Sequence, residues 1–317
     1  MMTPYLWRLC LLSLASAFAV QLVAGLVLRL FASKLIAWAE RFDPARAAAV
    51  MLAMRWLPGL LGVFVAGFLC VPSYLRLEEV EGDEEMGFLC LGLAALAVLS
   101  YLIPVMRTTI SVLRSERRLR TLLMGAEQES NDVSIIRQTS PAMALVGLFK
   151  SRVVVSREVM GLLTRDQMDA ALEHERAHSN SGDNYKRLVL QCAPIDGSSR
   201  KLRGAWARFT EWAADDQSTG GDSAKSVALA SALVSVARLK LPPCAVVTPH
   251  ASLLVADESD LRLRVERLLE PKKVGVRKFP ALLVCTTGAA LAMFFVAVAQ
   301  QPAVNAFVHE VLEALVG

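Results

Sequence analysis

Charged residues are scarce in this chain: they make up 20% of its 317 positions, while apolar residues make up 54%. This composition excludes a disordered or collagen-like chain. The net charge of +4 is too small to indicate nucleic-acid binding. None of the six cysteines forms a CxxC pair, and four lie in apolar runs, which predicts buried reduced thiols and no disulfide framework. A mean hydropathy of +0.43 is too high for an ordinary soluble enzyme, so the composition predicts a membrane protein.

The excess apolar residues lie in four runs, each close to the ~20 residues that a helix needs to cross a bilayer. The first run has an open alternative as a cleavable signal peptide, because Ala15-Ser16-Ala17 resembles a cleavage site. We favour a retained span, since the apolar stretch continues to Leu28. The predicted transmembrane helices are 9–28, 56–75, 87–106 and 279–300.

Basic residues flank these runs unevenly. Segments 29–55 and 107–278 are rich in Lys and Arg at their ends, whereas 78–85 is mostly acidic and 301–317 contains neither Lys nor Arg. The positive-inside rule therefore predicts a multi-pass protein of a bacterial-type inner membrane with 107–278 in the cytoplasm. The N-terminus and the tail 301–317 would lie outside. The acidic turn is either a cation or ligand site or, more simply, a solvated loop, and arginines 107–120 suit a lipid surface better than nucleic acid.

Segment 107–278 is long enough for a domain of its own. Short β-branched runs predict a small sheet or hairpin. Thr164 and Gln167 form a capping box that opens a helix, which Ser181-Gly182 ends. The predicted strands are Val133–Ile136 and Val153–Val155, and the later helices are Ser198–Asp216, Ser223–Leu239 and Leu261–Leu269. The expected fold is a mostly α membrane protein with three spans in 1–106, an α+β domain at 107–278, and a fourth span.

Residues 174–178 read His-Glu-Arg-Ala-His, an HExxH motif within the capped helix. Spacing i, i+4 places His174 and His178 on one helical face, so that both imidazoles can bind one Zn²⁺. Glu175 is then placed to act as general base, taking a proton from the water that attacks a peptide carbonyl. The sequence has only four histidines, and two of them occur in this motif.

A catalytic zinc site needs a third protein ligand, and Glu211 on the next predicted helix is the best candidate. Asp215 shares its helical face and could accept a hydrogen bond from a ligand imidazole. Alternatively, both carboxylates belong to a solvated helix face. Asp183 either braces His178 or only closes the helix, and both options stay open. His250 is either a surface loop histidine or, alternatively, a residue on the substrate side, and His309 is expected across the membrane.

The layout resembles the BlaR/MecR-type family of integral-membrane zinc metallopeptidases: three spans, HExxH, a Glu-x-x-x-Asp helix and a further span. The stretches 146–155 and 264–269 are similar to segments that flank the family's zinc motif. The resemblance implies a gluzincin-like, zincin-type domain with His174, His178 and Glu211 as zinc ligands and Glu175 as catalytic base. The chain departs from the family at 191–195 and in lacking, after 300, a penicillin-binding sensor domain.

The sequence therefore favours a membrane-embedded zinc endopeptidase that cleaves a cytoplasmic regulator or a membrane-protein segment. The expected partners are the lipid bilayer, a protein or peptide substrate and a separate sensor or transcriptional repressor, with no direct nucleic-acid contact. Two alternatives stay open. One is a quality-control protease similar to the HtpX/Ste-type family, and the other is an inactive transmembrane signalling scaffold.

Overall fold

The computed structural model describes residues 2–77, 87–123, 127–128, 133–136, 143–147, 152–195, 199–239, 252–253, 258–270, 297 and 301–316. Three helical segments in this part of the chain are long and apolar enough to cross a membrane: Tyr5–Ala39, Pro44–Leu77 and Phe88–Thr121. They contain the first two predicted spans and all of the third except Gly87. The fourth, 279–300, lies outside the described residues except for Ala297. The elements of the three segments are α1 (Met2–Ala39), α2 (Pro44–Val65), the π-helix η1 (Ala66–Cys70), α3 (Val71–Leu77) and α4 (Phe88–Leu123).

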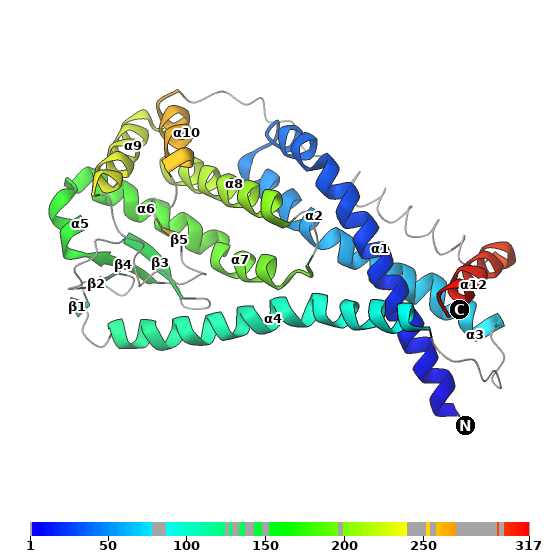
Figure 1. Ribbon diagram of the computed structural model, residues 1–317. Coiled ribbons are helices and arrows are strands. Elements are labelled where there is room, and N and C mark those ends of the chain that lie inside the picture. Colours follow the sequence, from blue (N-terminus) through cyan, green and yellow to red (C-terminus); the bar gives the residue numbers. More distant parts are fainter. Residues whose placement is uncertain are drawn as a thin grey trace.

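These helices extend well beyond the apolar runs that predicted them. Segment 29–55, expected as a connection between spans, is helical up to Ala39 and again from Pro44. The second helix begins there because the Asp43 side chain accepts hydrogen bonds from the first backbone amides and proline suits the first helical position. The tail also contains a helix, α12 (Pro302–Val316), which lies beside α3 near the N-terminus (Figure 1).

A five-stranded mixed sheet begins the domain that follows α4. Its order is β1-β2-β4-β3-β5, and only the β2–β4 pair is parallel. Both predicted strands are confirmed, but they do not form a hairpin with each other. Instead, β3 returns the chain and pairs antiparallel with β4, so β2 and β4 run parallel. The strands are β1 (Glu127–Gln128), β2 (Val133–Ile136), β3 (Met143–Val146), β4 (Arg152–Ser156) and β5 (Ser252–Leu253).

Six helices complete the described domain. The capping box predicted at Thr164 and Gln167 is confirmed, with both reciprocal hydrogen bonds present. Gly182 ends that helix in the left-handed region, at φ +66°. The helices are α5 (Arg157–Leu162), α6 (Arg165–Ser181), α7 (Asp183–Cys192), α8 (Ser199–Thr219), α9 (Ser223–Arg238) and α10 (Glu258–Leu269).

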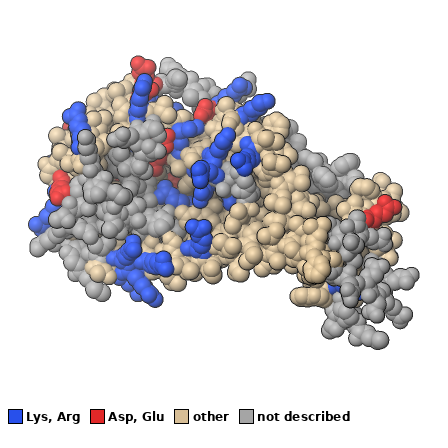
Figure 2. All heavy atoms as spheres, in the orientation of Figure 1, with Lys and Arg blue, Asp and Glu red and all other residues tan. Residues whose placement is uncertain are grey.

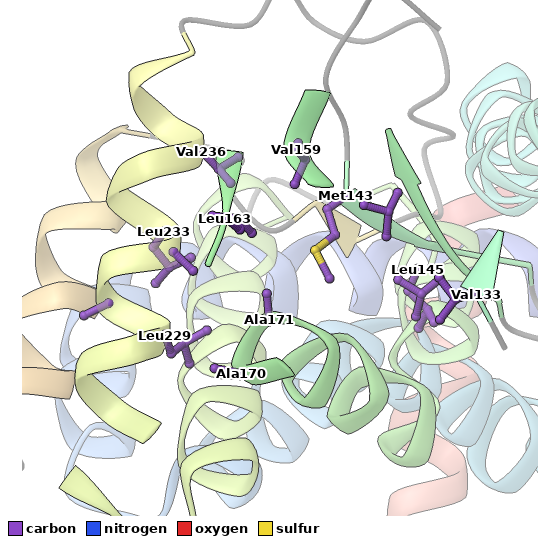
Figure 3. Close-up of a cluster of buried hydrophobic side chains, with 14 of the residues drawn as sticks. Val133, Met143, Leu145, Val159, Leu163, Ala170, Ala171, Leu229, Leu233 and Val236 are labelled. Carbon is purple, nitrogen blue, oxygen red and sulfur yellow. The ribbon is translucent and has the colours of Figure 1, made fainter. Parts of the chain in front are cut away.

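Two separate hydrophobic clusters hold these helices. The first, here called the domain core, joins the sheet to α5, α6, α9 and α10; Figure 3 shows side chains such as Met143, Ala171 and Leu233 converging between these elements. The second, the bundle core, joins Trp206 and Phe209 of α8 to α1 and α2. Thus α6 packs with the sheet, whereas α8 packs with the extensions of the apolar helices.

The charge distribution follows the same division. On the face shown in Figure 2, Lys and Arg side chains cluster over the domain and the adjoining ends of the long helices, while the surface towards α3 is mostly uncharged. Many large apolar side chains of α1, α2 and α4 are exposed, among them Leu30, Leu60 and Leu89. An apolar outer surface suits contact with lipid.

Candidate metal centre

The HExxH histidines lie side by side on the buried face of α6. Both His174 and His178 are fully buried, and their ring centroids are 4.8 Å apart with the ring planes perpendicular. The spacing expected of residues one helical turn apart is therefore realised, because the capping box and Gly182 keep α6 regular through the whole motif. The Nε2 atom of each ring faces Glu211 on α8.

Glu211 completes the group from α8. Its carboxylate oxygens lie 3.5 Å from Nε2 of His174 and 3.5 Å from Nε2 of His178. The three side chains each offer a ligand atom within 4.8 Å of the others, the spacing of a metal site. The Glu211 side chain is 17% exposed, while both imidazoles are inaccessible to solvent.

Three further side chains hold these groups in place. Asp215, one turn after Glu211, lies 3.0 Å from Nδ1 of His174, and Asp183 lies 2.8 Å from Nδ1 of His178. The structure thus places Asp183 as a brace for His178, although it also begins α7. The carboxylate at Nδ1 leaves Nε2 of His178 for a metal, whereas Nε2 of His174 also faces the guanidinium of Arg264 at 3.3 Å.

Arg264 on α10 is the part of the site that sequence reasoning did not identify; it featured there only within a family-like stretch. Its guanidinium donates to both oxygens of Asp215, at 2.7 and 2.9 Å, and lies 3.0 Å from Glu211 Oε2. It is also 3.3 Å from His174 Nε2. One available signal was the spacing of Arg264, which lies three residues after Leu261 and four before Leu268. That spacing places a basic residue on the apolar face of an amphipathic helix.

Charge compensation within the group shifts several pKa values. Burial favours neutral carboxyl groups, but the positive charges of His178 and Arg264 hold the pKa of Glu211 well below its usual range. The positive charge of Arg264 also lowers the pKa of Asp215 against the effect of burial. Burial alone would lower the pKa of His178. The negative charge of Glu211 and the hydrogen bond with Asp183 outweigh burial and raise that pKa to about 10.

Glu175 differs from the other carboxylates because it has no such partner. It is fully buried, and neither oxygen has a hydrogen-bond partner among the described residues. Burial raises its pKa to about 7 despite the positive charge of the neighbouring histidines. A buried carboxylate that titrates near neutral pH can both take up and release a proton, as a general base and acid must.

The donor set fits Zn²⁺. Two imidazole nitrogens and one carboxylate oxygen are ligands that zinc prefers, and atoms bound at about 2.1 Å in a tetrahedral site lie about 3.4 Å apart. The two imidazole-to-carboxylate distances of 3.5 Å agree with that spacing. His178 Nε2 has no hydrogen-bond partner in the described structure, as expected of a nitrogen reserved for a metal, whereas His174 Nε2 lies 3.3 Å from Arg264 Nη2.

The remaining histidines lie elsewhere. His309 is on α12, which packs against α3 and η1 at the opposite end of the long helices from the sheet (Figure 1). His250 and the acidic segment 78–85 lie outside the described residues. On α8, Trp206 and Phe209 are buried in the bundle core, and Trp212 lies at its edge.

Comparison with known proteins supports the same chemistry. The model of Peptidase family M48 matches residues 111–240, which include α6 with its HExxH motif and α8 with Glu211. This part of the chain is therefore similar to a metallopeptidase domain, consistent with a zinc metallopeptidase. The match does not extend to Arg264, and it leaves the BlaR/MecR type unconfirmed. No curated protein matches the chain.

Proposed function

We propose that this protein is a membrane-embedded zinc endopeptidase with His174, His178 and Glu211 as ligands and Glu175 as general base. The observation that carries the proposal is the unpartnered, fully buried Glu175 carboxylate beside three converging ligand side chains. The match of residues 111–240 to Peptidase family M48 and the three apolar helices support it.

The residues have distinct tasks in hydrolysis. A bound Zn²⁺ would polarise the scissile carbonyl and make a water more acidic. Glu175 takes a proton as the water oxygen forms its bond to the carbonyl carbon. Glu175 then gives that proton to the nitrogen as the C–N bond breaks, so that a carboxylate and an amine product leave. Asp215 and Asp183 keep the two imidazoles oriented, and Arg264 holds Asp215 and Glu211.

The substrate we infer is a protein segment at the cytoplasmic side of a bacterial-type inner membrane. It would be a cytoplasmic regulator, in a signalling pathway with a separate sensor or repressor, or a segment of a membrane protein. A quality-control protease would use the same site. The two differ in their products: a regulator gives discrete fragments from one bond, whereas quality control degrades misfolded proteins without a discrete cleavage site.

Zinc content and proteolysis measured together test the proposal. The purified wild type in detergent is expected to contain about one zinc per chain and to cleave a fluorescently labelled casein. Glu175→Gln should keep the zinc and lose activity by at least about a hundredfold, because general base catalysis is removed. Glu211→Ala should lose both. Glu173→Gln, on the exposed face of the same helix, is the matched control and should retain both.

Two results would contradict the proposal. Cleavage by Glu175→Gln at the wild-type rate would remove the mechanism. A well-folded wild type without zinc would favour the signalling scaffold, in which the HExxH helix is only structural.

A further inference from the structure

Residues 193–195, which follow α7, are hydrogen-bonded to the apolar helices α1, α2 and α4. Arg55 Nη2 on α2 donates to the carbonyl oxygens of Ala193 and Pro194, at 3.0 and 2.7 Å. The backbone amide of Ile195 donates to the Ser100 carbonyl on α4 at 3.1 Å. Gln21 Nε2 on α1 donates to the Ile195 carbonyl at 3.1 Å. We call residues 193–195 the anchor segment.

The predicted apolar runs would place the anchor segment within the membrane. With a rise of about 1.5 Å per residue, Gln21 and Ser100 lie about 10 Å inside the apolar runs that end at Leu28 and Met106. Non-helical backbone is tolerated at such depth only where protein surrounds it and satisfies its polar groups. Arg55, Gln21 and Ser100 are all buried and supply those partners. The contact between the anchor segment and the apolar helices is therefore specific, because buried polar groups pair across it. We call this contact the joint.

The helix that follows the anchor segment, α8, carries the third candidate ligand. The two histidines belong to α6, which is fixed by the domain core. Glu211 belongs to α8, which begins at Ser199, four residues after Ile195, and packs through Trp206 on α1 and α2. The candidate metal centre is thus assembled across the boundary between two packing units. A shift of the bundle against the domain core would therefore change the distance between Glu211 and the two histidines.

We propose that Arg55 is a positioning residue for the metal centre: its hydrogen bonds to the anchor segment set where α8 begins, and so where the Glu211 carboxylate lies relative to His174 and His178. The inference deepens the proposed function and rests on the same ligand set. Arg55 acts through α8, since Glu211 lies about 18 Å along that helix from Ser199. The packing of the apolar helices thereby controls metal affinity and turnover.

Gly59 offers a steric test of this joint. A Cβ added there would meet Pro194 Cγ at 2.7 Å and Tyr101 Oη at 2.8 Å, so Gly59→Ala pushes against the anchor segment. Gly92→Ala is the matched control because a Cβ at that helical glycine meets nothing within 4 Å. Both substitutions carry the same intrinsic helix propensity gain, and the contact with Pro194 and Tyr101 distinguishes them.

Arg55 is tested from the other side of the contact. Arg55→Met removes the donor while keeping much of the apolar stem, and Arg55→Lys restores a cation that can donate to both carbonyls. Arg46→Met, at an exposed position of the same helix, is the control. The readouts are the Zn²⁺ dissociation constant by chelator competition, the visible spectrum of the Co²⁺-substituted protein, and kcat and KM separately. Melting of the metal-free protein checks the fold.

The expected result is a Zn²⁺ affinity weaker by about tenfold or more for Gly59→Ala and Arg55→Met, as when a residue supporting a metal ligand is removed. The Co²⁺ spectrum should change and kcat should fall at little-changed KM. Arg55→Lys and both controls should stay near wild type. If Arg55→Met does not fold, Gly59→Ala decides.

Unchanged metal affinity and spectrum in a folded Gly59→Ala protein would overturn the joint, even if the wild type is a protease. Conversely, a wild type that binds zinc but cleaves nothing would overturn the proposed function, while the metal readouts would still test the joint.

Discussion

The two candidate histidine ligands contact different carboxylates, and this difference makes Asp215 testable at the level of a single residue. Asp215 is 1% exposed and contacts both His174 and Arg264. Asp215→Asn keeps the size of the side chain but removes the charge that both contacts use. We expect Zn²⁺ affinity to fall about 10- to 100-fold, the range seen when a partner of a ligating histidine is lost.

Asp216 provides the control for that substitution. It follows Asp215 directly, but its side chain is 48% exposed and pairs with Arg267 at the surface. Asp216→Asn should leave Zn²⁺ affinity unchanged in the same chelator competition. Equal losses from both substitutions would mean that the acidic pair acts through general electrostatics, not through the contact with His174.

Metal binding is expected to strengthen as the pH rises. In the metal-free protein, Glu211 and Asp183 raise the pKa of His178 to about 10, so the ring holds a proton at neutral pH that zinc must displace. The pKa of His174 is also raised, by Asp215 and Glu211 against the opposing effect of burial. Each released proton makes the apparent affinity rise about tenfold per pH unit below the pKa.

The measurement is the Zn²⁺ dissociation constant between pH 7 and 9, corrected for protonation of the competing chelator. Asp183→Asn removes one of the causes and should move the steep part of the curve to lower pH. A dissociation constant that does not change over this interval would show that the histidines are already neutral in the metal-free protein.

At the scale of the element, Gly182 fixes the junction between α6 and α7. Its φ of +66° is in the left-handed region, and a Cβ added there would meet nothing within 4 Å. Gly182→Ala therefore isolates backbone strain, and we expect it to lower the stability by about 1 kcal/mol. Gly204 lies at an exposed position within α8, and a Cβ added there would also meet nothing within 4 Å. Gly204→Ala should therefore raise stability by about 1 kcal/mol, because alanine has the higher helix propensity.

Thermal unfolding of the two variants in detergent distinguishes these effects, because the substitution is chemically the same. A fall in midpoint for Gly182→Ala alone supports strain at the junction. Two variants that shift in the same direction would indicate that the Gly182 backbone adopts another conformation in solution.

The helix that carries HExxH was predictable to its ends because its signals are local: a capping box at one end and a glycine at the other. Strands β2 and β4 were predictable for the same reason, from their β-branched residues. Their parallel pairing was not, since it depends on β3, whose residues Met143–Val146 carry no alternating pattern. The candidate ligand set followed from residue spacing, but the placement of Arg264 depends on tertiary packing.

Arg55 shows a limit of the same kind. In sequence it is one more basic residue at the edge of an apolar run, where the positive-inside rule counts it as a cytoplasmic charge. In the structure it is 4% exposed and donates to backbone 138 and 139 positions away. No local pattern encodes a partner that distant. The sequence departure from the BlaR/MecR-type pattern at 191–195 marked the region, although not its contact.

At the scale of the whole molecule, the long helices separate two ends. The sheet and the candidate metal centre lie at one end, and the N-terminus, α3 and α12 lie at the other (Figure 1). With the basic segments in the cytoplasm, the metal centre would be cytoplasmic and α12 outside. That arrangement requires a further crossing between α10 and α12, where the fourth apolar run occurs.

Cysteine labelling tests this orientation in a variant whose native cysteines are replaced. Phe307→Cys, at a position 65% exposed on α12, should react with a membrane-impermeant maleimide in intact cells. Gly204→Cys, exposed on α8, should react only after the membrane is permeabilised. Reversed reactivities would invert the orientation and place the metal centre outside. Labelling of both positions in intact cells would place α8 and α12 on the same side of the membrane. That result would contradict a fourth span between them.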